Sequence, residues 1–231
     1  MTSQTILKVD FWHYGYLKDA PQNQERHHRF VIDGASNFRR VENTHVYGVS
    51  QPTVNGLRQV IRNLLSSSER ILWINLREEP IIYINGIPYV LRDRAFTLRN
   101  LRAYKGITGS RMEQLEKRLK EDVIKEVMQC GGRILLHGED SNGNVLSSWE
   151  DVDIQDIMTV REVMEFAALE VRQTYDSSDD DSDNTKQPAV SNILEYYRVP
   201  ITAEKAPEWR DIDDLQALVT GVDHSKTAII M

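Results

Sequence analysis

The stretch ILWINL, residues Ile71–Leu76, decides the fold class because it is a continuous apolar run of strand length. An apolar run without alternation is typical of a strand that is covered on both faces. Upstream, Thr53 opens an amphipathic run from Val54 to Leu65, and the largely apolar segment 46–49 precedes it. A strand, a helix and a second strand in this order predict a right-handed crossover and a parallel pair. We therefore expect an α/β fold with a mainly parallel central sheet flanked by helices.

A β-hairpin elaboration follows this central strand in the sequence. Residues 81–91 read IIYINGIPYVL, and Asn85 and Gly86 occupy the two central positions of a predicted type I′ turn. Both positions of such a turn need positive φ, which Asn and Gly adopt readily. Pro88 has no N–H to donate, so we expect the second strand of the hairpin at an edge of its sheet.

The remaining elements follow from capping signals and periodicity. Ser110 and Glu113 match a capping box, which predicts a long helix that ends near Gln129, before Gly131-Gly132. We expect further strands at 133–137, 145–149, 193–199 and 227–231, and further helices at 160–173 and 212–219. The predicted organisation is an N-terminal arm at 1–30, with a short strand around Leu7, followed by one domain at 31–231. An acidic loop at 176–187 interrupts this domain, because its aspartates and serines are too polar to bury.

Composition and charge exclude several function classes. The chain has 231 residues, enough for one large domain or for one domain with an appendage. Its 28 Lys and Arg residues stand against 35 Asp and Glu residues, and the net charge of -7 argues against a nucleic-acid partner. Cys130 is the single cysteine, which excludes an internal disulfide and fits a reducing compartment. No run approaches the ~18 consecutive apolar residues of a transmembrane helix. We therefore expect a soluble, cytoplasmic protein with no transmembrane segment.

Five local sequences occur in a fixed order along the chain. They are GASNFRR (34–40), VYGVSQPT (46–53), WINLREEP (73–80), INGIPY (84–89) and YYRVPITAEKAP (196–207). Together they resemble a paladin repeat, a relative of the bacterial cysteine phytases, over about residues 30 to 231. The resemblance implies a tyrosine-phosphatase-like fold. It also implies action on inositol polyphosphates or phosphoinositides through a cysteinyl-phosphate intermediate, without a cofactor.

The catalytic residues that the resemblance implies are not found in this sequence. Such a site needs a thiolate in a loop of backbone amides, an arginine that holds the phosphoryl oxygens, and an acid for the leaving oxygen. The family supplies the first two in a Cys-x-x-x-x-x-Arg loop after a strand, whereas Cys130 is followed six positions later by Leu136. The family's general-acid position corresponds to Ala203, and the side chain of the adjacent Glu204 would point elsewhere.

Two interpretations follow from these departures. The strand that precedes the family's nucleophile loop resembles residues 227–231, so the domain is expected to be C-terminally incomplete, a fragment of a longer phosphatase. Alternatively, the chain is a degenerate repeat, a non-catalytic pseudophosphatase module that binds a phosphorylated inositol, a phosphoinositide or a signalling protein. Under both interpretations we expect no phosphatase activity from the chain alone.

Arginines are the candidate phosphate ligands, because the guanidinium fork matches phosphate oxygens. The candidates are Arg39, Arg40, Arg77, Arg92, Arg94 and Arg198. The alternative for Arg39 and Arg40 is an ion pair at the surface. The alternative for Arg92 and Arg94 is a solvent-exposed basic face. Arg77 and Glu78 follow the buried strand, so they belong either to the rim of a pocket or to an internal ion-pair network; Glu204 is a second rim candidate.

Two further side-chain types have simple interpretations. Cys130, at the end of a predicted helix, is expected to be a buried or half-buried structural cysteine, since free Cys behaves as a small hydrophobe. His27-His28 is the nearest approach to a metal motif, but adjacent histidines do not share a helix face and no carboxylate spacing completes a ligand set. We therefore expect no metal site.

Overall fold

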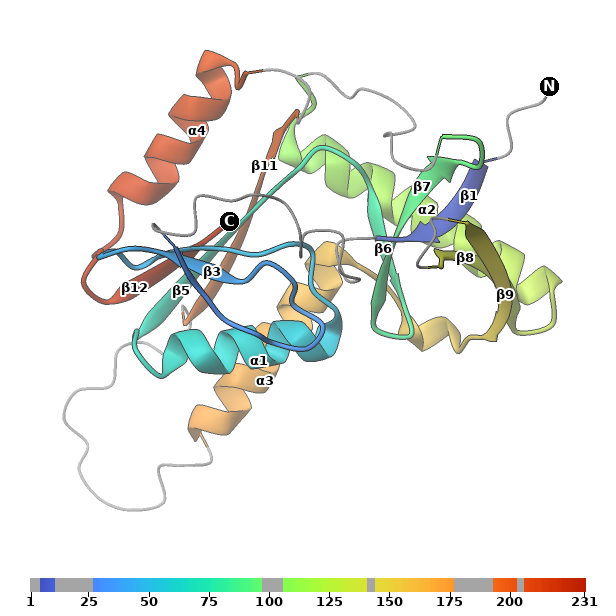
Figure 1. Cartoon of the computed structure of the whole chain (residues 1–231), viewed down its shortest axis with the longest axis horizontal. Helices are drawn as coiled ribbons and strands as arrows, with labels where there is room; N and C mark the ends of the chain where they lie inside the picture. The colour runs from blue at the N-terminus through green and yellow to red at the C-terminus, as the bar shows by residue number, and fades with distance from the viewer. Residues whose placement is uncertain (1–4, 11–26, 97–105, 141–143, 177–192, 203–205) are drawn as a thin grey trace.

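A computed structural model describes residues 5–10, 27–96, 106–140, 144–176, 193–202 and 206–231. Within these residues the chain forms two six-stranded sheets and four α-helices. The sheets lie side by side, as Figure 1 shows. We call them the β5 sheet and the β6 sheet, after one central strand of each.

The β5 sheet contains the parallel core that the sequence predicts. Its strand order is β11-β5-β12-β4-β3-β2. The bounds are β11 Leu194–Ile201, β5 Arg70–Arg77, β12 Thr227–Ile230, β4 Val46–Gly48, β3 Arg39–Val41 and β2 His27–Arg29. The first four strands are parallel, and β3 and β2 continue the sheet in antiparallel pairing. The strands β4 and β5 are parallel as predicted, but β12 lies between them and pairs with both.

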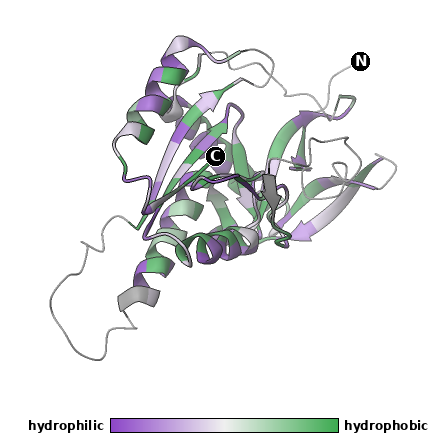
Figure 2. Ribbon diagram, turned by 60° about the vertical axis from the view of Figure 1, so that its left-hand side comes forward, coloured by the Kyte–Doolittle hydropathy of each residue, from purple (hydrophilic) through white to green (hydrophobic). Residues whose placement is uncertain are grey.

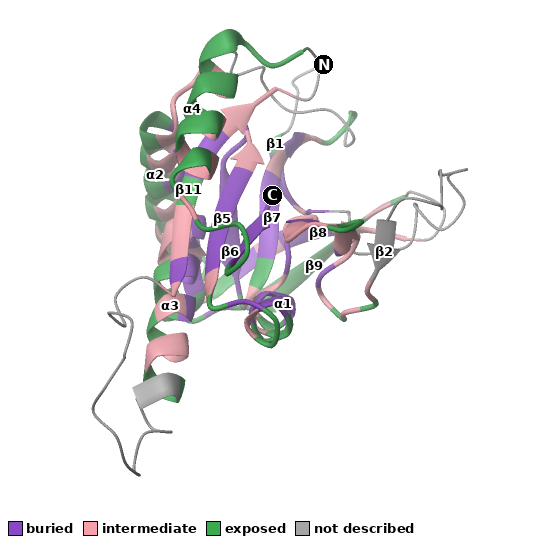
Figure 3. Cartoon of the chain, turned by 90° about the vertical axis from the view of Figure 1, so that its left-hand side faces the viewer, coloured by how far each residue is buried: buried purple, intermediate pink, exposed green. Residues whose placement is uncertain are grey.

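Helices cover both faces of the β5 sheet, which explains the uninterrupted apolar run in β5. The helices are α1 Val54–Leu65 and α3 Val160–Asp176 on one face and α4 Trp209–Thr220 on the other. Ile71 and Trp73 pack toward α1 and α3, whereas Leu72 and Ile74 pack toward α4. Figure 3 shows β5 buried along most of its length, while α4 exposes much of its surface. The helices alternate hydrophobic and hydrophilic bands in Figure 2, as expected for helices that cover a sheet.

The β6 sheet was not predicted as a separate sheet. Its strand order is β10-β6-β7-β1-β8-β9. The bounds are β10 Ile157–Thr159, β6 Ile81–Ile84, β7 Ile87–Asp93, β1 Thr5–Val9, β8 Arg133–Glu139 and β9 Val145–Asp151, with a short 3-10 helix η2 at Ile154–Asp156. All pairs are antiparallel except β1 with β8. The helix α2 Gly109–Gln129 covers one face, where Val123 and Val127 pack against Leu7 and Ile134.

The predicted β-hairpin turn is confirmed, but the prediction that its second strand lies at a sheet edge is wrong. Asn85 and Gly86 have φ of 51° and 77°. The strand β7 is not an edge, because it pairs with both β6 and β1. Pro88 is tolerated there because it lies one residue beyond the last β1–β7 pair, Val9 with Tyr89.

Of the two predicted helix N-caps, the one of α1 is confirmed and the one of α2 is wrong. Thr53 caps α1, and its hydroxyl accepts the N–H of Gly56 at 3.0 Å. The cap of α2 is Thr108, which accepts the N–H of Arg111 at 3.3 Å, so the predicted capping box at Ser110 is wrong.

Some expectations fall on residues outside the described ranges. Residues 11–26 of the N-terminal arm, residues 177–187 of the acidic loop, Ala203 and Glu204 belong to them. In the part of the chain that is described, no helix combines the length and the apolar character needed to cross a bilayer.

Candidate functional site

The carboxyl ends of three parallel strands meet at one edge of the β5 sheet and border a pocket of about 240 Å³. The segment 49–52 after β4, residues 73–77 of β5 and Met231 after β12 line this carboxyl-edge pocket. Ligands of open α/β sheets bind at this edge, because the loops that leave the strands can offer backbone and polar groups there. A larger groove of about 740 Å³ lies between α1 and α3. Its lining residues belong to α1, α3 and Ser66, and none of them lies at the carboxyl ends of the strands.

Asn75 and Gln51 form a polar floor of the carboxyl-edge pocket, and a series of hydrogen bonds joins them to Tyr83, which does not line the pocket. The side-chain amide of Asn75 donates to Gln51 at 3.3 Å, and the amide of Gln51 donates to the Tyr83 hydroxyl at 2.6 Å. That hydroxyl donates in turn to the carbonyl of Pro52 at 2.7 Å. Burial of Tyr83 raises the pKa of its phenol despite the bond from Gln51, so the hydroxyl stays neutral. These hydrogen bonds fix the segment after β4 to Tyr83 of the β6 sheet.

Arg77 is the candidate phosphate ligand that lines this pocket. Its Nη1 donates to Asp10 Oδ2 at 2.8 Å, and its Nη2 donates to Asp10 Oδ1 at 3.3 Å and to Glu79 Oε1. Burial by itself would lower the pKa of Arg77, but the charges of Asp10 and Glu79 outweigh it and raise the pKa. A guanidinium carries five N–H groups. Three of them are committed to described carboxylates, so two remain for a ligand.

Arg198 does not line the pocket but binds the backbone of the segment from Arg77 to Glu79. Its Nη1 donates to Glu116 Oε1 at 2.5 Å, and its Nη2 donates to the carbonyls of Glu79 at 2.9 Å and Arg77 at 3.1 Å. Glu116 is fully buried, and this burial raises the pKa of its carboxyl. Arg198 therefore holds the backbone of the β5–β6 connection in place.

Arg92 and Glu78 are buried without lining the pocket, and Arg94 is exposed. Arg92, on β7, forms an ion pair with Glu79, and its Nη2 donates to Glu79 Oε1 at 3.0 Å. Glu78 is 5% exposed. Arg94 follows the end of β7 on the surface.

Arg39 and Arg40 are neighbours on β3, but their side chains reach different segments. Arg39 pairs with Gly48 at the carboxyl edge, and its Nη1 donates to the carbonyl of Asn37 at 3.0 Å. The Arg39 guanidinium packs over Gly48, and a Cβ at this glycine would lie 2.7 Å from the Arg39 Cζ and displace the flexible end of that side chain. Arg40 instead reaches the carbonyl of Thr44 at 2.6 Å, before β4 begins. Of the two, Arg39 is therefore the one beside the carboxyl-edge pocket.

The site also contains residues that sequence reasoning missed. Asp10, Glu79 and Glu116 hold the arginines, and Tyr83 holds Gln51, which belongs to the pocket floor. Gln51 and Glu79 stand inside sequence blocks that carry the family resemblance, which was the available signal. Asp10 and Glu116 have no local pattern that marks them.

Cys130 is exposed, so the expectation of a buried or half-buried cysteine is wrong. It caps the C-terminus of α2, beyond the last residue that packs inward, and Gly131 with φ of 68° turns the chain away after it. Among the described residues, no group of three or more His, Cys, Asp or Glu side chains is placed to hold a metal ion.

Comparison with known proteins assigns the chain to a family. A family model described as "PTPlike_phytase: Inositol hexakisphosphate" matches residues 74–231. The chain belongs to the PTP-like phytase family. Its relatives by sequence include the Paladin of Gallus gallus, 38% identical over 93 residues, and the Paladin of Xenopus tropicalis, 28% identical over 112 residues. These matches cover 39% and 46% of the chain but 11% and 13% of the two Paladins.

Solved PTP-like phytases share the fold. A tandemly repeated protein tyrosine phosphatase like phytase from Mitsuokella multacida has a TM-score of 0.59 at 14% identity, over 97% of this chain and 33% of that one. A PTP-like phytase from Bdellovibrio bacteriovorus has a TM-score of 0.51 at 14% identity, over 100% of this chain and 65% of that one. The predicted tyrosine-phosphatase-like α/β fold is confirmed.

Proposed function

We propose that residues 1–231 form a module that binds a phosphorylated inositol in the carboxyl-edge pocket, with Arg77 as a phosphate ligand. The observation that carries this proposal is the state of Arg77, which lines the pocket while described carboxylates occupy three of its five N–H groups. A guanidinium held in this way has a fixed position and plane, so its charge and its remaining N–H groups, on Nε and Nη1, are fixed at the pocket, which suits a phosphate. Inositol polyphosphates and phosphoinositide headgroups share this chemistry.

A solved relative supports the ligand class. The PTP-like myo-inositol phosphatase of Mitsuokella multacida, with a TM-score of 0.57, was solved in complex with myo-inositol-(1,3,4,5)-tetrakisphosphate. The family model that matches this chain also carries inositol hexakisphosphate in its description. We extend the ligand class to this chain as a proposal.

We further propose that residues 1–231 do not hydrolyse phosphate esters through a cysteinyl phosphate. The sequence has one cysteine, and it stands at the exposed end of α2 with Leu136 six positions later instead of an arginine. A fragment of a longer phosphatase and a non-catalytic repeat both predict this result for residues 1–231. A cytoplasmic location is part of the proposal, and the single free cysteine supports it.

Titration of residues 1–231 with inositol hexakisphosphate in a calorimeter tests the binding. We expect saturable binding that Arg77→Ala weakens by about tenfold or more, since a charge-assisted bond to phosphate is lost. Arg118→Ala is the matched control, because it removes the same charge from an exposed position on α2. Equal losses in the two variants, or no binding by the wild type, would refute the proposed site.

Release of inorganic phosphate from the same ligand tests the absence of turnover. We expect none above the spontaneous rate. Phosphate release that Cys130→Ser abolishes would contradict the proposal, since it would make the exposed cysteine a nucleophile.

A further inference from the structure

We infer that Asp10 is a positioning residue of the carboxyl-edge pocket, which orients Arg77 for a phosphate although Asp10 itself carries negative charge. The inference rests on the proposed function and deepens it. It assigns to the β6 sheet a role in ligand binding at the edge of the β5 sheet.

Asp10 is rigidly placed. It follows β1, is 2% exposed, and its N–H donates to the carbonyl of Pro88 at 3.0 Å. Both carboxylate oxygens receive N–H groups of Arg77, at 2.8 and 3.3 Å. A two-point contact fixes the plane of a guanidinium as well as its position. Asp10 therefore sets the direction in which the remaining N–H groups of Arg77 point.

Glu79 is a second carboxylate that binds Arg77, and the β6 sheet fixes it as well. Glu79 accepts from Arg77 and from Arg92, and Arg92 stands on β7 opposite Ile6 of β1. Burial would raise the pKa of Glu79, but its bonds to Arg92 and Arg77 outweigh burial and lower the pKa, so the carboxylate stays ionised. The guanidinium is thus held by Asp10, which follows β1, and by Glu79, which Arg92 of β7 holds in turn. The Arg77 side chain keeps an exposed fraction of 23% and lines the pocket.

Positioning and simple electrostatics predict opposite results when Asp10 loses its charge. Coulomb's law alone predicts that an anion binds more tightly once a neighbouring carboxylate is removed. If Asp10 orients Arg77, the same change releases a long side chain that must then be ordered by the ligand, and affinity falls. A lower affinity of Asp10→Asn therefore indicates positioning, and a higher affinity indicates simple electrostatics.

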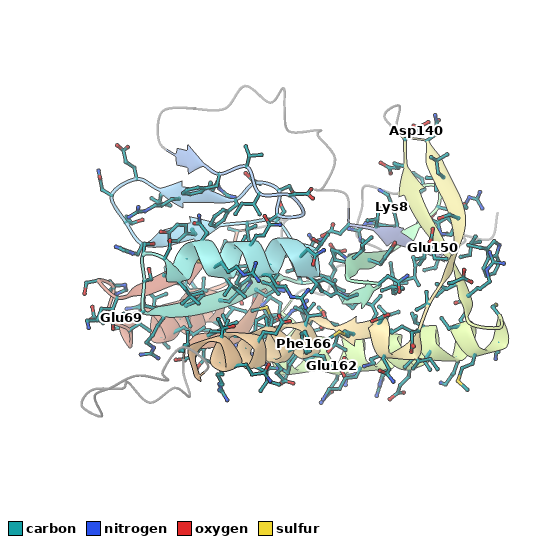
Figure 4. The ribbon with its side chains drawn as sticks, turned by 90° about the horizontal axis from the view of Figure 1, so that it is seen from below. Lys8, Glu69, Asp140, Glu150, Glu162 and Phe166 are labelled. Atoms are coloured by element: carbon teal, nitrogen blue, oxygen red, sulfur yellow. The ribbon has the colours of Figure 1, made fainter. Side chains whose placement is uncertain are left out.

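A double-mutant cycle on residues 1–231 tests the inference, with inositol hexakisphosphate as the probe. We expect Asp10→Asn to weaken binding about tenfold in the wild-type background and to have no further effect in an Arg77→Ala background. Glu69→Gln is the matched control for charge, because Glu69 pairs with the exposed Lys226 at 3.0 Å. Figure 4 shows Glu69 at the opposite end of the molecule from Lys8, two residues before Asp10 in sequence. This control should bind like the wild type.

Three outcomes would overturn the inference. Tighter binding by Asp10→Asn would show that Asp10 acts through its charge, and unchanged binding would show that it does not orient Arg77 for the ligand. An equal loss in the Arg77→Ala background would show a general structural role. If Asp10→Asn does not fold, Asp10→Glu keeps the charge and displaces the carboxylate by one methylene, and wild-type affinity for that variant would equally refute positioning. Absence of binding by the wild type refutes the proposed function, whereas binding that depends on Arg77 but not on Asp10 refutes this inference alone.

Discussion

Replacing Tyr83 by Phe removes a single buried hydroxyl that ties the pocket floor to the β6 sheet. The hydroxyl accepts from Gln51 at 2.6 Å and donates to the carbonyl of Pro52 at 2.7 Å, and Tyr83 is 1% exposed. The ring keeps its shape in the variant, so no side-chain cavity adds to the cost. What is lost is hydrogen bonding alone.

The expected loss of stability is about 2 kcal/mol. The bond to Pro52 contributes about 1 kcal/mol net, and the buried carbonyl of Pro52 then lacks a partner, which costs about as much again; the bond from Gln51 adds little, because Gln51 is partly exposed and can bind water. For a chain of this size the melting temperature should fall by about 4 to 8 °C. Urea unfolding followed by the fluorescence of buried Trp73 measures the free energy directly, and the slope with urea should not change.

Tyr89→Phe is the matched control. Tyr89 is 7% exposed on the neighbouring strand, and its hydroxyl has no hydrogen-bond partner among the described residues. Its loss should cost less than about 0.5 kcal/mol. A Tyr83 variant within 0.5 kcal/mol of the wild type, or equal costs for the two tyrosines, would refute the reasoning about the pocket floor.

Three further predictions concern stability and exposure. Gly56→Ala should cost about 2 kcal/mol or more in urea unfolding, because its Cβ would stand 2.2 Å from the Gly34 carbonyl, whereas Gly138→Ala meets nothing within 4 Å and should be neutral. Glu79→Gln should cost about 3 kcal/mol at pH 7. The pKa of Glu79 is lowered on folding, so its contribution to stability is present above the ordinary pKa of about 4.3 and is lost as the pH falls. The free energies of unfolding of the wild type and Glu79→Gln should therefore converge in acid. A difference that stays constant with pH would count against the ion pair. Cys130 should react with a maleimide in the folded protein as fast as a free thiol does, since it is exposed; protection until denaturation would contradict this.

Local sequence patterns predicted most of the strands of both sheets, but not that these strands form two separate sheets. The apolar run of β5, the cap at Thr53 and the turn at Asn85 are signals that lie within a few residues of what they specify. The β6 sheet depends on pairings between distant segments, such as Lys8 with His137, for which a single sequence carries no mark. Its edge strand β10 is three residues long, too short to show a period.

The candidate site shows the same division. The edge of the sheet and the importance of Arg77 follow from the strand that precedes it. Whether an arginine is free or paired depends on partners far along the chain, as for Arg198 with Glu116. Residue type alone therefore predicted six phosphate ligands, of which Arg77 lines the pocket and Arg39 lies beside it.

The central place of β12 constrains the order in which the fold can be assembled. Ile229 pairs with Val46, and Thr227 pairs with Arg70, so β4 and β5 cannot be joined until a strand made much later in synthesis inserts between them. Until then both present unpaired backbone groups and apolar side chains, a state that favours association with other chains. Contacts this distant in sequence close slowly. A nascent chain that has passed residue 77 but not residue 227 is therefore the stage at which we expect the greatest dependence on chaperones.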